Sequence, residues 1–313
     1  MATYQTFTAV GQREDLSDVI YNISPTDTPF MSTVGKGKAT AVYHEWQTDS
    51  LAAAVLTNAA VEGADASSIT ASPTTRAGNR TQIFQKTVQV SGTLESVDKA
   101  GRKSEKAYQL AKASSEIKRD IELTLLSNQI ASAGDSSTAR KLGGLQAWLG
   151  GSFGTDGVAG SAGTTARTNG TNRTFTEDIL KSVVKTVYEA GGNPKVLMVN
   201  PSHKQTVSAF AGIAAQRFMA PADAPTTIIG AADVYMSDFG TISVVPNRFM
   251  NSTNSGNEVA FVFDPEYFSV DYLRPFATNE LAKTGDSEKT QILAELTLAV
   301  KNAGAGAVAA DLS

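Results

Sequence analysis

Cysteine is absent from the 313 residues of this chain, and histidine occurs only twice. The lack of cysteine excludes disulfides, cysteine–zinc sites, thiol catalysis and iron–sulfur clusters. Two histidines leave little scope for a histidine-rich metal site. No apolar run approaches the roughly 18 residues of a membrane-spanning helix, and the first residues lack the pattern of a signal peptide. The net charge of −4 lacks the basic surplus typical of proteins that bind duplex DNA.

Proline and glycine are both missing between Gly101 and Gly134, which favours a long helix within residues 93–134. The aliphatic residues there recur at nearly helical spacing, and they are Leu110, Ile117, Ile121, Leu125 and Ile130. Charged residues, Glu122 among them, fall mainly on the other faces. Some 30 residues would give a rod of roughly 45 Å. Because the apolar stripe is narrow, we expect the helix to lie across other elements, either as an ordinary surface helix or as a structural spine.

An arm and then a hairpin are predicted before this helix. The arm covers residues 1–36, with a short helix near residues 13–20 and proline-rich breaks after it. Residues 35–38 (GKGK), where the arm ends, lack the spacing of a phosphate-binding loop and are interpreted as a flexible turn. Residues 40–47 and 80–91 alternate like two strands, separated by about 30 mostly small and polar residues. Such a hairpin cannot build its own core, so either it lies on a neighbouring copy or the insertion is disordered.

After the helix, residues 140–170 form a glycine-rich excursion, and a compact α/β unit follows at residues 174–264. The excursion has an apolar anchor that consists of Leu142, Leu145, Trp148 and Leu149. In the α/β unit Thr176 is expected to cap one helix, and Asn200 with Pro201 opens another. The expected strands are residues 195–199, 233–236, 241–245 and 259–263.

The last section is expected to hold a strand at residues 267–273, a mostly polar loop at 275–288 and a long strand at 291–301. The last strand alternates, with Ile292, Ala294, Leu296, Leu298 and Val300 on one face. Glu295 is expected on the opposite face. A half-buried strand of this kind is suited to packing along one side of the long helix.

The sequence contains few motifs that could indicate a catalytic site. Residues 150–154 (GGSFG) match the pattern of a serine nucleophile, but that motif works only as a strained turn between a strand and a helix. A serine hydrolase would have to use Ser152, Asp178 and His203, and this reading is kept as a remote alternative. Nothing in the sequence brings His44 and His203 together. We therefore predict no catalytic, cofactor-binding or metal-binding residues and no cofactor, which indicates a self-assembling structural protein.

Over nearly its whole length the chain resembles the major capsid proteins of tailed bacteriophages, which have the Hong Kong 97-like fold. The resemblance rests on the order of the elements and on four phrases, which are residues 27–31 (DTPFM), 195–203 (KVLMVNPSH), 239–246 (FGTISVVP) and 295–302 (ELTLAVKN). The last phrase resembles the closing strand of that fold. The resemblance implies an α+β protein with an N-terminal arm at 1–36 and an extended β-hairpin loop at 37–94. It also implies a peripheral domain with a spine helix at 95–174 and 265–313, and a compact α/β axial domain at 175–264.

The same resemblance implies a function and partners. Members of this family self-assemble through pentamers and hexamers into an icosahedral shell around double-stranded DNA. The expected partners are further copies of the chain, a portal, a separate scaffolding protein and DNA that is enclosed without sequence-specific binding. No membrane is expected, and the location is the virion, with assembly in the host cytoplasm. The chain starts directly at the arm, so no built-in scaffold is expected, and no covalent cross-link is predicted. The alternative is an encapsulin-like shell of a bacterial nanocompartment.

Overall fold

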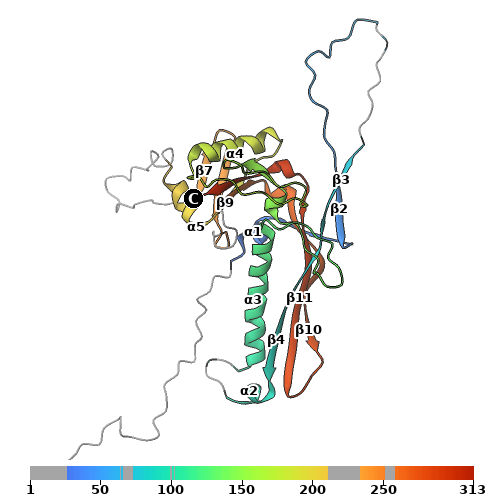
Figure 1. Ribbon diagram of the computed structural model, residues 1–313, viewed down its shortest axis with the longest axis vertical. Coiled ribbons are helices and arrows are strands. Elements are labelled where there is room, and N and C mark those ends of the chain that lie inside the picture. Colours follow the sequence, from blue (N-terminus) through green and yellow to red (C-terminus); the bar gives the residue numbers. More distant parts are fainter. Residues whose placement is uncertain are drawn as a thin grey trace, which may run out of the picture.

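A long helix, two β-sheets and a projecting hairpin make up the described part of the chain (Figure 1). The computed structural model describes residues 27–63, 65, 73–98, 101, 103–210, 233–250 and 258–313. The helix predicted near residues 13–20 lies outside the described residues. None of the described helices combines the length and apolarity that a membrane crossing requires.

The long helix, α3, runs from Glu105 to Leu126 and has 22 residues, so its length is about 33 Å. It is shorter than predicted because side chains cap its beginning. Ser104 Oγ accepts a hydrogen bond from the amide of Ala107, and Glu95 Oε2 accepts one from the amide of Glu105. Glu95 belongs to a separate short helix, α2 (Gly92–Ser96).

The buried face of α3 follows the predicted stripe over most of its length. Ile117, Ile121 and Leu125 are almost completely buried. The helix ends where Ser127 turns to an extended conformation, so Ile130 lies beyond it and is 43% exposed. The prediction that Ile130 belongs to the apolar stripe of the helix is therefore wrong. Glu122 is also buried, although the charge pattern placed it on an outer face.

A four-stranded sheet, which we call the spine sheet, packs against α3. Its order is β1 (Gly35–Lys38), β10 (Phe268–Leu281), β11 (Ser287–Val300) and β4 (Gln82–Ser91). The strand predicted at residues 291–301 corresponds to the second half of β11, and its alternating aliphatic face is buried as expected.

Two segments of the spine sheet differ from the prediction. Residues 35–38 form a strand parallel to β10 rather than a flexible turn. The polar loop predicted at residues 275–288 is also wrong. Most of these residues belong to β10 and β11, which pair antiparallel as far as Leu281 and Lys289. Backbone pairing satisfies the amides and carbonyls of these polar segments whatever their side chains are.

The larger sheet has six strands in the order β5 (Gly150–Ser152), β12 (Gly306–Leu312), β9 (Glu258–Phe263), β6 (Val196–Val199), β8 (Gly240–Pro246) and β7 (Val234–Ser237). The four strands expected in the α/β unit are all present. Strands β5 and β12 come from outside residues 175–264, so the sheet extends beyond the predicted limits of the axial domain. The closing strand is β12, whereas residues 295–300 belong to β11.

Two helices of this unit, α4 (Glu177–Glu189) and α5 (Pro201–Ser208), pack their apolar residues on the same face of the six-stranded sheet. Both predicted caps are confirmed. Thr176 Oγ1 accepts a hydrogen bond from the amide of Ile179, and Asn200 Oδ1 accepts one from the amide of His203. A short 3-10 helix, η4 (Pro265–Tyr267), follows β9.

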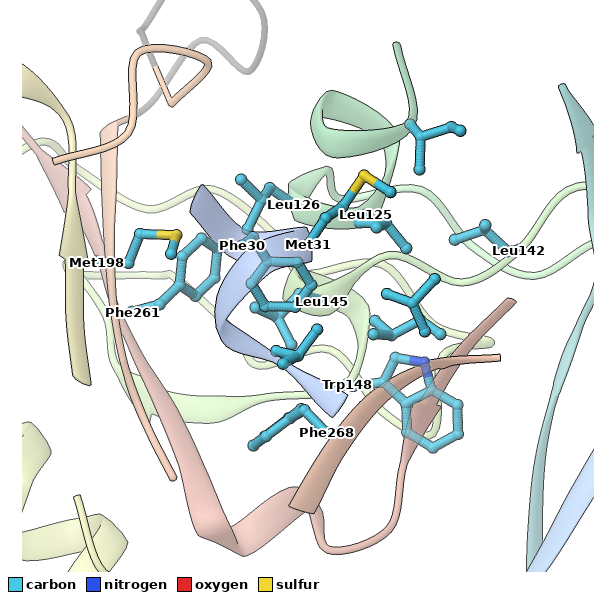
Figure 2. Packing of buried hydrophobic residues seen from close by; sticks show 14 of the residues in the cluster. Phe30, Met31, Leu125, Leu126, Leu142, Leu145, Trp148, Met198, Phe261 and Phe268 are labelled. Atoms are coloured by element: carbon cyan, nitrogen blue, oxygen red, sulfur yellow. The ribbon is translucent and has the colours of Figure 1, made fainter. Parts of the chain in front are cut away.

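The opposite face of the six-stranded sheet shares a core with α3, the spine sheet and the short helix α1 (Pro29–Thr33). Figure 2 shows Phe30 and Met31 of α1 close to Leu125, Leu145 and Phe261. The predicted anchor residues are all buried; Leu145 begins the 3-10 helix η2 (Leu145–Ala147), and Trp148 and Leu149 follow it. A second 3-10 helix, η5 (Ala303–Ala305), leads into β12.

Replacing Ile121 with Ala should lower the free energy of unfolding by about 2–5 kcal/mol, because it leaves a cavity in this core. The matched control is Ile130→Ala, for which we expect a loss within about 0.5 kcal/mol because Ile130 is exposed and outside the helix. Urea denaturation of the isolated subunit measures both. Equal losses in the two variants would contradict the placement of the helix end.

Candidate assembly interface

The hairpin consists of β2 (Tyr43–Thr48) and β3 (Thr75–Arg80), paired from Tyr43 and Arg80 to Thr48 and Thr75. The predicted second strand, residues 80–91, is wrong as a hairpin partner, because it is β4 and pairs with β11. The hairpin extends away from the rest of the chain, and the described residues that follow β2 lie toward its far end (Figure 1). We call the described residues 49–63 of this end the distal loop.

Four aliphatic side chains of the distal loop are open to solvent. Leu51 and Leu56 have relative exposures of 99% and 101%, and Val55 and Val61 have 66% and 80%. Single exposed aliphatic residues are normal on protein surfaces, but a group of four in one loop indicates an interaction site. Nothing in the described part of the chain covers them.

The base of the hairpin, in contrast, packs on its own chain. The indole rings of Trp46 and Trp148 have centroids 5.6 Å apart. His44 Nε2 lies 2.8 Å from Asp271 Oδ2 of β10. These contacts place one predicted strand face, which includes His44 and Trp46, against the body of the molecule.

The hairpin joins the spine sheet at residues 79–81, and Asn79 fixes this joint. Its side chain is fully buried. Its Nδ2 donates to the carbonyl oxygens of Gly143 and Leu298 at 3.0 and 2.8 Å, and its Oδ1 accepts from the amide of Gly143 at 2.8 Å. One amide side chain therefore connects the hairpin to β11 and to the anchor segment. The sequence gives no sign of this role.

Glu295 of β11 completes the joint from the other side. Its carboxylate accepts hydrogen bonds from Thr81 Oγ1 at 2.7 Å, from Arg274 Nε at 2.8 Å and from Arg140 Nη2. Burial acts to raise the pKa of Glu295, but the hydrogen bond from Thr81 and the two guanidinium groups outweigh it and hold the pKa below its usual value. The predicted outward position of Glu295 is wrong, since its side chain is buried among these partners.

A second buried carboxylate, Glu122 of α3, holds the arm where it enters the described chain. Its Oε1 accepts from the amide of Phe30 at 2.6 Å and from Asn247 Nδ2 at 2.8 Å, and its Oε2 accepts from the amide of Met31 at 3.0 Å. Burial raises the pKa of Glu122, because these donors are neutral and only partly offset the loss of hydration.

The residues of the hydrolase alternative are not brought together. Ser152 Oγ accepts a hydrogen bond from Arg173 Nη2 at 3.0 Å, and β5 is a strand rather than the strained turn that the motif needs. His203 Nε2 lies 2.7 Å from Glu258 Oε2. No contact joins Ser152, Asp178 and His203 within the described residues. His44 and His203 have different carboxylate partners. Among the same residues no group of histidine and acidic side chains could hold a metal ion.

Comparisons with known proteins agree on one family. The family model described as SU10 major capsid protein matches residues 2–313. The major capsid protein of Escherichia phage Phieco32 is 29% identical over 346 residues, which cover 95% of this chain and 94% of that protein. In the capsid asymmetric unit of cyanophage A-1(L), the similar chain has a TM-score of 0.71 at 12% identity, with 99% of both chains covered.

A shell protein of another kind has the same fold. The holo-SrpI encapsulin complex of Synechococcus elongatus PCC 7942 matches with a TM-score of 0.55 at 11% identity, over 100% of this chain and 97% of that one. At such identities the likeness shows the fold alone. The family model and the phage relative therefore distinguish a phage capsid protein from a nanocompartment shell.

Replacing Glu295 with Gln should lower the free energy of unfolding by about 1.5–3 kcal/mol near neutral pH, because charged hydrogen bonds are lost. The folded chain holds this pKa below the unfolded value. The contribution is therefore fully present above the unfolded pKa of about 4.3 and is lost as the pH falls through the folded pKa. The difference from wild type should accordingly shrink in acid, as measured by denaturation across pH. Glu288→Gln on the exposed end of β11 is the control, and an equal loss there would refute the role of Glu295.

Replacing Glu122 with Ala should speed hydrogen exchange at the amides of Phe30 and Met31, because both would lose their acceptor. The loss of stability should reach about 1–3 kcal/mol for each donor left unpaired. Glu122→Gln keeps one carbonyl oxygen in place and should retain much of the protection. Hydrogen exchange measured by mass spectrometry or NMR tests this. Unchanged protection in the Ala variant would show that Glu122 does not hold the arm.

Proposed function

Because this chain belongs to the SU10 major capsid protein family, we propose that its distal loop is the element that joins neighbouring copies in the shell of a tailed phage. The protein is a structural component of the phage capsid and has the Hong Kong 97-like fold. The observation that carries the proposal is the group of four exposed aliphatic side chains at the end of an anchored hairpin. In one isolated copy these side chains remain in water.

Burial of these side chains against another copy would supply a driving force for assembly. Fully burying one aliphatic side chain contributes about 1.5–3 kcal/mol. Four of them in each copy give on the order of 6–12 kcal/mol before the cost of association is subtracted. Every copy carries the same loop, so the contacts repeat around a closed shell and the gain is multiplied by avidity.

We assign the domains on the same basis. The N-terminal arm covers residues 1–36 and the extended loop covers 37–94, as the resemblance implies. The peripheral domain contains α3 with β10 and β11, and β1 at the end of the arm and β4 of the extended loop complete its sheet. The axial domain is centred on residues 175–264 and includes β5 and β12, because both strands hydrogen-bond within its six-stranded sheet.

Assembly through pentamers and hexamers, with double-stranded DNA inside, is part of the same proposal, and membership of the family supports it. The net charge of −4 supports enclosure of the DNA rather than tight binding of its phosphates. A portal and a separate scaffolding protein complete the proposed set of partners. The same reasoning assigns a structural role and no catalytic one.

Replacing the four aliphatic residues of the distal loop with Ser should abolish or strongly weaken assembly while leaving the subunit folded. The variant carries Leu51→Ser, Val55→Ser, Leu56→Ser and Val61→Ser. Its free energy of unfolding should change little, because these side chains are already exposed. Size-exclusion chromatography and electron microscopy of the assembly reaction measure the outcome.

The control for this experiment is Val158→Ser, at a residue that is 59% exposed on the glycine-rich excursion. It should assemble like wild type. Normal shells from the four-residue variant would overturn the proposed role of the distal loop.

A further inference from the structure

A cavity of about 500 Å³ lies at the C-terminal end of α3. Its apolar wall consists of Leu123, Leu126, Phe249, Met250 and Val259. Pockets that bind drug-sized ligands have volumes of roughly 300–1,000 Å³, so this one has room for more than one aliphatic side chain.

Several polar side chains also line the cavity, but they are engaged elsewhere. Asn128 exchanges two hydrogen bonds with the backbone of Arg167. Gln129 Nε2 donates to Gln82 and to the carbonyl oxygen of Leu142. Gln146 Nε2 donates to the carbonyl oxygen of Leu126. Since these groups already have partners, the cavity favours an apolar occupant.

One arginine stands beside the apolar wall, and a second precedes Phe249 in the sequence. The guanidinium carbon of Arg119 lies 5.6 Å from the centroid of the Phe249 ring, and Arg119 Nε is buried without a hydrogen-bond partner in the described structure. Arg248 precedes Phe249 and is exposed. Neither arginine forms an ion pair with a described residue. The edge of the cavity is therefore positively charged.

The distal loop combines apolar residues with charges opposite to those at the edge of the cavity. Between Lys38 and Arg76 the sequence contains no lysine or arginine. Its charged residues within the distal loop are Asp49 and Glu62, which flank the four exposed aliphatic side chains. An apolar segment bordered by acidic groups matches an apolar cavity bordered by basic groups.

The loop that fills the cavity must come from a second copy. The hairpin of the same chain points away from the body, and pairing of β2 with β3 and the contact between Trp46 and Trp148 hold it there (Figure 1). The sequence that follows the cavity wall, residues 251–257 (NSTNSGN), contains no apolar side chain. We propose that the distal loop of one copy inserts aliphatic side chains into this cavity of a second copy, with its acidic residues beside Arg119 and Arg248. This assignment rests on the proposed function and specifies the receiving surface.

Cross-linking tests the assignment directly, because the chain has no cysteine of its own. One variant carries Leu56→Cys in the distal loop, and a second carries Leu123→Cys on the cavity wall. Shells assembled from a mixture should form a disulfide-linked dimer of the two variants under mild oxidation, seen on non-reducing gels. The control replaces the second variant with Met236→Cys, an exposed position on β7, and should give no such dimer.

If a cysteine variant does not assemble, a pair of charge-reversal variants provides a second test of the assignment. Glu62→Lys and Arg248→Glu should each weaken assembly by about two- to fivefold, which corresponds to one exposed ion pair. The double variant should recover most of the loss. If shells form and need the aliphatic residues of the loop, but Leu56→Cys links to the control position or to neither, the cavity assignment is wrong and the proposed function stands. If the four-residue Ser variant assembles normally, the proposed function itself fails.

Discussion

The buried hydrogen bonds of Asn79 and Glu295 hold together the point where three parts of the chain meet. Asn79 connects the hairpin to the backbone of Gly143 and Leu298, and Glu295 connects Thr81 to two arginines. A buried polar group that loses its partner costs free energy, so none of these segments can shift alone. The hairpin has no hydrophobic core of its own, so this network of hydrogen bonds is what fixes its direction.

The two ends of the hairpin therefore have different roles. The base, through Trp46 and His44, contacts its own subunit, whereas the described residues of the distal loop are exposed. Binding a partner with a hairpin that already points in one direction loses less conformational entropy than ordering a free segment. Exposure of aliphatic side chains is tolerable in one copy because the base keeps the stability of the subunit independent of the loop.

The elements that the sequence predicts well are those with a clear period. The apolar faces of α3 and α4, the strands β6 and β9 and the second half of β11 all follow from the sequence pattern. The polar halves of β10 and β11 were missed because their pairing depends on backbone groups, which no side-chain pattern reveals. Glu122 and Glu295 were placed outward because a charge usually faces water. The available signal is that Glu295 interrupts an apolar run and that Glu122 directly follows Ile121, but the partners of both come from distant segments.

Glu122 and Glu295 also respond to acid in opposite directions, and the reason lies in their partners. Two guanidinium groups and a hydroxyl keep Glu295 ionised, so protonation removes a stabilising contribution from the joint of the hairpin. Glu122 has only neutral donors, and its raised pKa means that the folded chain favours the protonated form. Its ionisation therefore costs stability as the pH rises through the folded pKa. A global unfolding curve sums the two effects and can hide both. Glu122 at the arm and Glu295 at the hairpin are thus two separate electrostatic systems within one subunit. Each has to be followed by a local probe or by the difference between a variant and wild type.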